Sequence, residues 1–353
     1  MNLQPFKGAN VLVVGGAGFV GSNLVHMLLR SELCSLTIVD NFLSAEKVNV
    51  PEDQRVTVIE GSIADDKILS DLPEHLDYVW HLACYHGNQS SIADPMADHD
   101  NNSLTSLKLF QTLSTRTNLT KVVYSAAGCA VAEKTYGSPT ATPEDAPVSL
   151  FHDSPYSISK LIGEMYGNYF FRHTGFPFVK ARFQNVYGPR EILGAGIWRG
   201  TSATVWRNVI PTFIWKALNG DVLVLDNGGN VSRDFIFVDD ICRGLIACAL
   251  SGQPGEAYNI ASGMETSIKQ LAETIIKLTG SGATMKVGPA RDWDNSGRRF
   301  GSTEKAEHEL GFRSEVSLVE GLQHTVNWTV SNKHLISKCI SKHAQHMATT
   351  GRI

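Results

Sequence analysis

The fold is indicated most clearly by one stretch near the amino terminus, Val11-Leu12-Val13-Val14-Gly15-Gly16-Ala17-Gly18-Phe19-Val20-Gly21. Its aliphatic run is apolar throughout rather than alternating, which is typical of a strand that is buried on both faces of a parallel sheet. The glycines at 15, 18 and 21 then permit a tight turn that lets a phosphate approach backbone N–H groups. Residues 21–30 have helical spacing, so the turn leads into a helix amino terminus, which favours an anion.

Short apolar strands and longer helical stretches alternate to about residue 125, and a further helix is predicted near residues 156–173. The predicted buried strands are Val11–Val14, Leu36–Val39, Val56–Ile59, Tyr78–His81 and Val122–Tyr124, and the predicted helices span 21–30, 102–114 and 156–173. Such a βαβ series predicts an α/β fold with a Rossmann-like, doubly wound parallel sheet.

Composition excludes several functional classes. The chain has 31 basic and 35 acidic residues among 353, a net charge of −4, so it lacks the basic surface expected for nucleic acid or an anionic membrane. Its six cysteines form no Cys-x-x-Cys pair, so no metal site is expected. No apolar run approaches the ~20 residues of a membrane span. We therefore expect a cytosolic protein.

Two segments are predicted to be long loops. Residues 133–155 contain several prolines, and residues 188–211 are rich in glycine and lack a clear period. A loop as long as the second one is usually functional. The tail from Lys333 is expected to be a last surface helix that frays.

Asp40 predicts the cofactor. It ends the second strand, 19 residues after Gly21. A carboxylate there accepts hydrogen bonds from the adenine ribose and repels the 2′-phosphate of NADP, so NAD is favoured. The alternative is a turn cap, because Asp40-Asn41 is also a turn-forming pair.

Tyr156 and Lys160 are four residues apart and therefore share a helix face. A nearby ammonium lowers the pKa of a phenol, so that the phenol can take a proton from a sugar hydroxyl near neutral pH. The alternative is a chance spacing in a structural helix.

With these motifs the chain resembles the extended short-chain dehydrogenase/reductase family, in particular its NAD-dependent nucleotide-sugar epimerases and dehydratases. The resemblance covers about residues 9–330. Besides the glycine turn and Tyr156/Lys160, it rests on Asp40-Asn41, His81-Leu82-Ala83, Asp94-Pro95, Asn102, Arg182, Asn185 to Arg190, Arg233 to Asp240, and Tyr258-Asn259-Ile260.

The resemblance implies an NAD-binding Rossmann domain over 1–185 and about 234–257, a smaller interleaved substrate-binding lobe over 186–233 and 258–330, and a tail over 331–353. The implied cofactor-binding residues are Gly15, Gly18, Phe19, Val20, Gly21, Asp40, Asn41, Leu82, Ala83, Asn102, Tyr156 and Lys160. In the lobe, Asn185 and the loop before Pro211 would contact the nucleotide. Arg233 and Arg291 would hold the diphosphate, unless they form surface ion pairs.

The sequence departs from the family after the strand Val122–Tyr124. Ala127 occupies the position of a Ser or Thr that binds the reacting sugar hydroxyl. Gly128 and Cys129 stand where 4,6-dehydratases carry an Asp-Glu pair, although Glu133 could substitute. Cys129 matches an acid/base cysteine of 3,5-epimerases, and its alternative role is that of a small buried residue.

Two further residues are candidates for substrate contact. His86 lies in the loop after the fourth strand, where it either binds substrate or is merely solvated. Arg199 lies in the glycine-rich loop and is a candidate to receive the carboxylate of a uronic acid sugar.

The leading hypothesis is NAD-dependent epimerisation at carbon 4 of a nucleotide sugar. We expect a UDP-linked sugar, with N-acetylated and uronic acid forms among the candidates. Tyr156 removes the proton of the 4-hydroxyl while hydride passes to NAD and later returns to the other face. The alternatives are a dehydratase or a 3,5-type epimerase that uses Cys129, and a non-catalytic sensor of NAD or nucleotide sugar.

The resemblance also implies a homodimer through the helices near 102–114 and 156–173. Their apolar residues, which could equally be core, are Leu104, Leu107, Phe110, Leu161, Met165, Tyr169 and Phe170.

Overall fold

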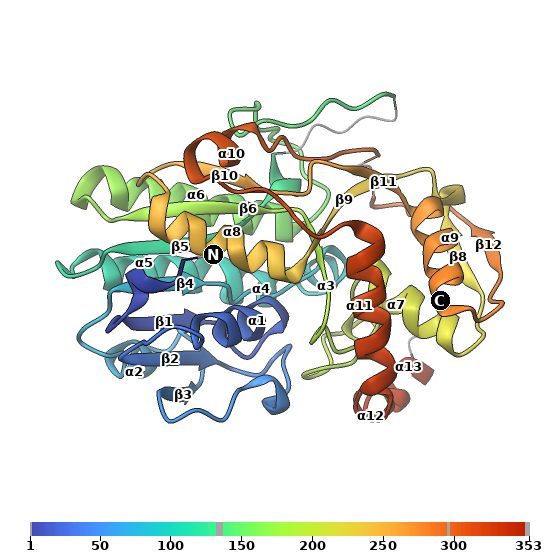
Figure 1. The fold of residues 1–353 in the computed structure, drawn as a ribbon, viewed down its shortest axis with the longest axis horizontal. Coiled ribbons are helices and arrows are strands. Elements are labelled where there is room, and N and C mark those ends of the chain that lie inside the picture. Colours follow the sequence, from blue (N-terminus) through green and yellow to red (C-terminus); the bar gives the residue numbers. More distant parts are fainter. Residues whose placement is uncertain (1, 132–136, 295–296, 350–353) are drawn as a thin grey trace.

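A parallel seven-stranded sheet forms the centre of the molecule in a computed structural model, which describes residues 2–131, 137–294 and 297–349 (Figure 1). Its strands are β1 (Asn10–Val14), β2 (Ser35–Asp40), β3 (Val56–Glu60), β4 (Tyr78–His81), β5 (Lys121–Ala127), β6 (Phe178–Phe183) and β10 (Ala257–Ile260). The order β10-β6-β5-β4-β1-β2-β3 places β1 inside the sheet, with crossovers to both sides. This arrangement confirms the predicted doubly wound fold.

Helices cover both faces of this sheet. The helices α1 (Phe19–Leu28) and α8 (Val238–Ser251) pack together on one face, and α5 (Thr105–Ser114) and α6 (Pro155–Thr174) pack on the other. Along β1, Val11 and Val13 enter the first core, whereas Leu12 and Val14 enter the second. The two-sided burial explains why the strand is apolar throughout.

The lobe lies beside the carboxyl ends of the parallel strands, on the right of Figure 1. It contains β7 (Asn185–Tyr187), β9 (Ser232–Phe237) and β11 (Glu265–Ser267) in one sheet, β8 (Leu223–Asp226) and β12 (Met285–Gly288) in another, and the helices α7 (Val209–Leu218), α9 (Ile268–Thr279) and α11 (Leu318–Ser331). The remaining short elements are α2 (Asp66–Ser70), α3 (Asn88–Ala93), α4 (Pro95–Asp98), α10 (Glu304–Leu310), α12 (Lys333–Ser341), α13 (Ala344–Thr349), a π-helical turn His99–Leu104, and the 3₁₀ turns Gln4–Phe6, Lys47–Asn49, Gly128–Ala130, Ser202–Thr204 and Asn227–Gly229.

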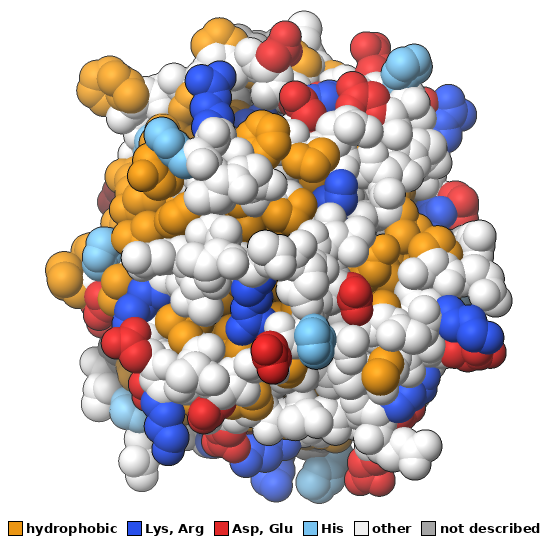
Figure 2. All heavy atoms as spheres, turned by 90° about the vertical axis from the view of Figure 1, so that its left-hand side faces the viewer, with side chains coloured by type: hydrophobic (Ala, Val, Ile, Leu, Met, Phe, Trp, Pro, Cys, Tyr) orange, Lys and Arg blue, Asp and Glu red, His pale blue; other side chains and the backbone are white. Residues whose placement is uncertain are grey.

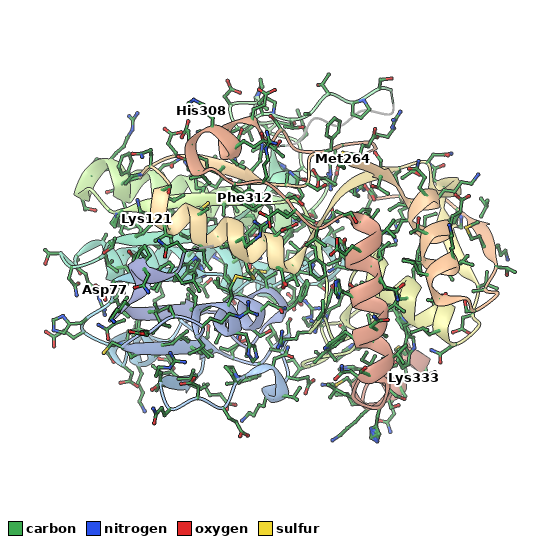
Figure 3. All side chains as sticks on the ribbon, viewed as in Figure 1. Asp77, Lys121, Met264, His308, Phe312 and Lys333 are labelled. Atoms are coloured by element: carbon green, nitrogen blue, oxygen red, sulfur yellow. The ribbon has the colours of Figure 1, made fainter. Side chains whose placement is uncertain are left out.

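Polar contacts at the amino-terminal end of the sheet hold the strand ends together (Figure 3). The Asp77 carboxylate accepts a hydrogen bond from Asn10 N at 2.8 Å, and Lys121 Nζ donates one to Gly252 O at 2.6 Å. The residues with predicted chemistry gather at the opposite, carboxyl edge. In an open α/β sheet that edge is where ligands bind.

Some predicted boundaries were wrong. The strand predicted at Val56–Ile59 is not buried on both faces, because β3 is the last strand of the sheet and Val58 is exposed. The predicted loop 188–211 ends early, since α7 begins at Val209. The helix predicted from residue 102 begins as the π-helical turn that ends at Leu104.

The tail is anchored rather than frayed. Ile336 and Cys339 of α12 are buried together with Ile192, Leu193 and Ala195 from the glycine-rich loop. Their positions three residues apart face one side of the helix. The carboxyl-terminal helices therefore support the loop that carries Arg199.

A buried ion pair fixes α6 to the sheet. Arg182 of β6 donates two hydrogen bonds to the Glu164 carboxylate, at 2.9 and 2.8 Å, and the two side chains are only 8% and 5% exposed. Removing one charge of such a pair leaves the other buried and uncompensated.

We therefore expect Glu164→Gln to lower the free energy of unfolding by about 3 kcal/mol. The matched control is Glu60→Gln, which breaks the exposed Lys47–Glu60 pair at 2.8 Å and should cost less than about 1 kcal/mol. Urea denaturation of the three proteins measures both values. Equal losses in the two variants would show that burial does not decide the strength of the inner pair.

Candidate active site

The glycine turn brings three backbone segments into contact at the carboxyl edge of the sheet. Gly15 has φ 85°, and a Cβ added there would lie 2.5 Å from Ala83 N. A Cβ on Gly21 would overlap Gly15 O. Leu82 N and Ala83 N both donate to Val14 O at 2.8 Å, which holds the end of β4 against the turn.

The amino terminus of α1 faces the same place. Gly18 is its N-cap and makes no side-chain capping bond, and Phe19 and Val20 begin the helix. Its first N–H groups and its dipole therefore favour an anion such as a pyrophosphate. The glycines let the turn pack this tightly against its own backbone, and the N–H groups at the start of α1 then suit the pyrophosphate of a dinucleotide.

Asp40 lies beside this turn with a fixed carboxylate. Its Oδ2 accepts a hydrogen bond from Ala17 N at 3.0 Å, and its Oδ1 accepts one from Phe42 N at 2.9 Å. Burial raises the pKa of Asp40, and these backbone hydrogen bonds oppose the rise. The structure thus places a buried acceptor at the edge of the turn, where a ribose would lie.

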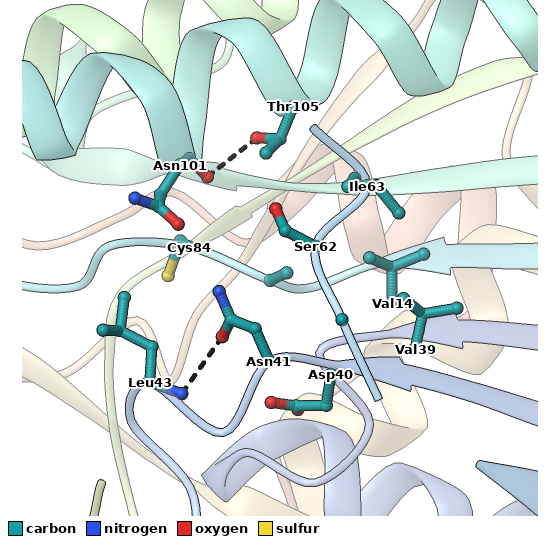
Figure 4. Close-up of a pocket in the computed structure, with 12 residues that line it drawn as sticks. Val14, Val39, Asp40, Asn41, Leu43, Ser62, Ile63, Cys84, Asn101 and Thr105 are labelled. Carbon is teal, nitrogen blue, oxygen red and sulfur yellow. Dashed lines mark hydrogen bonds between the residues drawn. The ribbon is translucent and has the colours of Figure 1, made fainter. Parts of the chain in front are cut away.

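Asp40 also lines a small pocket at this edge of the sheet (Figure 4). It is lined by Val14, Val39, Asp40, Asn41, Leu43, Gly61, Ser62, Ile63, Ala83, Cys84, Asn101 and Thr105. The side chain of Asn41 is held by Leu43 N, which donates to Asn41 Oδ1 at 3.0 Å. The lining mixes aliphatic walls with a few fixed polar groups, as small-molecule sites do.

The start of α6 positions the Tyr156–Lys160 pair. Pro155 is the first helical residue, and the Ser154 side chain caps the helix. Tyr156 N donates to Ser91 Oγ of α3 at 3.1 Å, and the Tyr156 side chain hydrogen-bonds with that of Cys84.

Lys160 is buried one turn further along α6. Its Nζ donates to Ser125 Oγ at 3.3 Å and lies 4.5 Å from the ring centroid of Tyr124. The hydroxyl and the aromatic face fix the buried ammonium one helical turn from Tyr156, where a positive charge stabilises a neighbouring phenolate.

The end of β5 carries Ala127 at the position where relatives have a Ser or Thr hydroxyl. Ala127 is the last residue of the strand and is buried. Ser125 points elsewhere, as expected, because its hydroxyl donates to His81 O at 3.0 Å and accepts from Lys160. Cys129 follows β5 in the turn Gly128–Ala130, but its side chain, like all of Glu133, lies outside the described part of the structure.

Asn102 makes its contacts within the protein. Its Oδ1 accepts from Tyr85 N at 2.7 Å, and its Nδ2 donates to Asp98 Oδ1 at 2.8 Å and to Ser159 Oγ at 3.1 Å. It joins the loop after β4 to α6 and so supports Lys160, the neighbour of Ser159. Its π-helical setting is common at functional sites.

His86 belongs to a hydrogen-bonded chain that the sequence did not reveal. Asn208 Nδ2 donates to Glu191, so Asn208 Oδ1 faces His86 Nε2, at 3.4 Å. This amide oxygen can only accept, and His86 Nε2 is therefore the protonated ring nitrogen. Burial lowers the pKa of His86 to about 4, which leaves Nδ1 as an acceptor. The ring centroids of His86 and Tyr156 are 5.7 Å apart in an edge-on arrangement.

Arg199 lies on the other side of His86. Its Nη1 donates to His86 O at 2.8 Å, and its guanidinium lies over the Tyr85 ring at 5.4 Å. Its backbone N donates to Thr204 Oγ1 at 2.9 Å. The glycine-rich loop and the loop after β4 therefore meet beside the Tyr156 side chain.

The lobe separates the predicted arginines. Arg233 is buried: its Nη1 donates to Ser232 O and Gly297 O, both at 2.7 Å, and its Nη2 forms a largely buried ion pair with Asp294 at 3.2 Å. Arg291 instead forms a surface ion pair with Asp226 at 2.5 Å and is 46% exposed, because it lies on the outer segment after β12.

Arg299 is a buried arginine close to the contacts of Arg233, because it lies between Gly297 and Gly301. Gly297 O accepts from Arg233, and Gly301 N donates to Asp234 Oδ2 at 3.3 Å. Asn185 begins β7 and Pro211 is buried in the first turn of α7.

Over the described ranges 2–131, 137–294 and 297–349, no three His, Cys, Asp or Glu side chains are grouped as a metal would require. In the same ranges no helix has the length and apolar character needed to cross a bilayer.

Comparisons with known proteins agree with this geometry. The model of the NAD dependent epimerase/dehydratase family matches residues 11–261. The crystal structure of the Bordetella bronchiseptica enzyme WbmF in complex with NAD+ and UDP is 55% identical, covers 98% of this chain and 99% of that one, and has a TM-score of 0.88.

Two curated relatives represent two reactions. A putative UDP-glucose 4-epimerase of Methanocaldococcus jannaschii is 30% identical over 327 residues, which are 91% of this chain and 99% of that protein. A dTDP-glucose 4,6-dehydratase of Streptomyces antibioticus is 30% identical over 340 residues, which are 92% and 93% of the two chains. The predicted resemblance and the predicted cofactor, NAD, are confirmed: the chain belongs to the NAD-dependent epimerase/dehydratase family.

Proposed function

We propose that the protein epimerises a nucleotide sugar, UDP-linked, at carbon 4. The observation that carries this proposal is the position of Tyr156 and Lys160 at the start of α6, a helix that packs against the turn Gly128–Ala130. In this turn Gly128 stands where a dehydratase has its first carboxylate. NAD, when bound, would accept the hydride of carbon 4 and later return that hydride to the sugar. The remaining chemistry is the movement of one proton.

Tyr156 moves that proton. It accepts the proton of the 4-hydroxyl as a phenolate and returns it after the sugar has turned over in the pocket. The buried Lys160 ammonium, on the same helix face, stabilises the phenolate. His86 Nδ1 accepts a hydrogen bond from a neighbouring sugar hydroxyl, a contact that compensates for the hydroxyl absent at Ala127.

The lobe holds the nucleotide. Asn185 and the segment before Pro211 contact the nucleoside, and Arg233 contacts the diphosphate. Arg299 takes the role first given to Arg291, because it is buried two residues after Gly297, whose carbonyl contacts Arg233, whereas Arg291 is bound to Asp226 at the surface. A guanidinium suits this role since its N–H groups match phosphate oxygens.

A second candidate reaction uses Cys129. It keeps the transient 4-ketone but exchanges a proton at carbon 5 or 3 through the thiol, as in a 3,5-type epimerase. The observation in its favour is the position of the Cys129 backbone, directly after the carboxyl end of β5 and in contact with the start of α6.

We propose a homodimer formed through α5 and α6. Phe110 is fully buried and belongs to the core, but Met165 and Tyr169 on α6 are 56% and 55% exposed. Figure 2 shows hydrophobic side chains gathering on the side of the molecule where these helices cover the sheet. A second copy would remove this apolar area from water.

The described cysteines support the expectation of a cytosolic protein. Cys34, Cys84, Cys242, Cys248 and Cys339 are free thiols. Free thiols persist in reducing compartments.

With NAD present, the protein should convert one or more members of a panel of UDP-hexoses, including N-acetylated and uronic forms, at carbon 4. Tyr156→Phe should lower kcat by about 10²–10⁴-fold because the proton acceptor is lost. Tyr166→Phe, on the same helix, is the control. NMR of the sugar protons measures both. No change at carbon 4 across the panel would refute epimerisation, and turnover that needs Tyr156 would exclude a non-catalytic sensor.

Repeating the reaction in deuterated water separates the two candidate reactions. Epimerisation at carbon 4 through hydride return leaves carbon-bound hydrogens unexchanged. Deuterium at carbon 5 or 3, lost in Cys129→Ala, would favour the thiol-dependent reaction instead.

Asp40→Asn should weaken NAD binding by about tenfold and bring the affinities for NAD and NADP closer together, because the charge that repels a 2′-phosphate is removed. The control is Asp65→Asn at the exposed cap of α2. Calorimetric titration of nucleotide-free protein measures both ligands. An unchanged NAD/NADP ratio would mean that Asp40 is only a turn cap.

Light scattering should give about twice the chain mass of 38.5 kDa. Met165→Asp should shift the protein toward the monomer, because a carboxylate in the apolar contact would be desolvated. The control Lys277→Asp lies on α9, away from both helices. A monomeric wild-type protein would contradict the proposed dimer.

A further inference from the structure

Arg199 is a buried guanidinium with spare donors. Its side chain belongs to a residue that is only 5% exposed, and its Nε is buried without an acceptor in the described part of the chain. The single hydrogen bond given to its side chain is the one from Nη1 to His86 O, at 2.8 Å. Burial lowers the pKa of Arg199. A charge kept in this state is costly unless a ligand compensates for it.

The neighbouring Arg207 shows what a satisfied guanidinium looks like. Its Nη1 donates to Ser44 O at 2.8 Å, its Nη2 to Ala195 O, and its Nε to Thr204 O at 3.4 Å. Two carboxylates also lie near Arg207, those of Glu191 and Glu46. Arg199 has neither the full set of carbonyls nor a carboxylate within ion-pair distance among the described residues.

Burial also limits the negative charge of the Glu191 carboxylate. The pKa of Glu191 is raised to about 7, so near neutral pH Glu191 is only partly ionised. The two buried arginines therefore face a partly ionised Glu191. The other carboxylate near Arg207, that of Glu46, is paired with Lys342. The cluster has a local positive excess although the whole chain has a net charge of −4.

This positive excess lies next to the reacting sugar position. The carbonyl of His86 binds Arg199, and the ring of the same residue lies 5.7 Å from that of Tyr156. The helix α3 connects the two sides as well, because Ser91 Oγ accepts from Tyr156 N while α3 packs against the turn Ser202–Thr204. Arg233 and Arg299, in contrast, lie on β9 and the segment after residue 297, where they serve the diphosphate.

We propose that Arg199 binds a carboxylate on the sugar ring, so that the substrate is an acidic nucleotide sugar. The proposal rests on the proposed function, since the sugar is placed by Tyr156. A guanidinium fork pairs with a carboxylate through two parallel hydrogen bonds, which a neutral hydroxymethyl group cannot reproduce. The loop is also held ready for this contact, because Tyr85 stacks on the guanidinium and Thr204 fixes its backbone.

The first test needs no variant. NAD-loaded protein is titrated with UDP-glucuronate, with the isosteric but neutral UDP-glucuronamide, and with UDP-glucose, and the dissociation constants are measured by calorimetry. The acid should bind about 30-fold more tightly than either neutral ligand, since a charge-assisted pair forms in a desolvated site. Equal affinities for the acid and the amide would overturn the proposal.

The second test removes the guanidinium. Arg199→Gln should bring the three ligands within about threefold of one another while UDP alone binds as before. Arg313→Gln, at an exposed pair with Glu307, is the control and should keep the wild-type preference. A preference for the acid that survives in Arg199→Gln would also overturn the proposal. If that variant does not fold, the comparison of acid and amide still decides.

Failure of the proposal and failure of the proposed function are distinguishable, because binding is measured without turnover. A preference for the acid without reaction at carbon 4 would leave the carboxylate site standing and remove the epimerase. Epimerisation of neutral UDP-hexoses with equal affinity for acid and amide would do the reverse.

Discussion

The contact of backbone with backbone at the glycine turn is the constraint on which the site depends. Gly15 lies so close to Ala83 N, and Gly21 so close to Gly15 O, that no other residue fits at either position without a shift. Because the turn is this tight, α1 starts at the carboxyl edge of the sheet, and its amino terminus, Asp40 and the loop after β4 face one space. The position of this space therefore determines where a cofactor and a substrate can bind.

Local patterns predicted the parts of the site that lie close together in the sequence. The glycine turn, the end of the strand at Asp40 and the one-turn spacing of Tyr156 and Lys160 each follow from the geometry of a single element. Glu191 and Asn208 could not be predicted in this way, because their link to His86 joins segments more than 100 residues apart. The sequence around a polar loop residue does not indicate its hydrogen-bond partner, because the fold brings that partner from a distant segment.

Burial, rather than net charge, decides what the charged residues do. Arg182 and Glu164 compensate for each other and hold α6. Arg291 matched the expected diphosphate position, yet it forms an exposed pair with Asp226. Arg299, which no motif indicated, is buried on the segment whose Gly297 O contacts Arg233. The sign and number of charges in a sequence do not reveal such pairs, since solvent exposure sets their strength.

The tail illustrates how a distant segment completes a site. Gly194 has φ 69°, and a Cβ there would lie 2.6 Å from Cys339 O, so α12 can approach the loop only because this residue is glycine. His343 Nε2 bonds Gly194 O at 2.9 Å, and the Trp198 ring stacks on His346 at 5.0 Å. Trp198 directly precedes Arg199. The packing of the tail on this loop fixes the backbone next to Arg199, whose guanidinium donates to His86 O, so the side chain is held in place before any ligand binds.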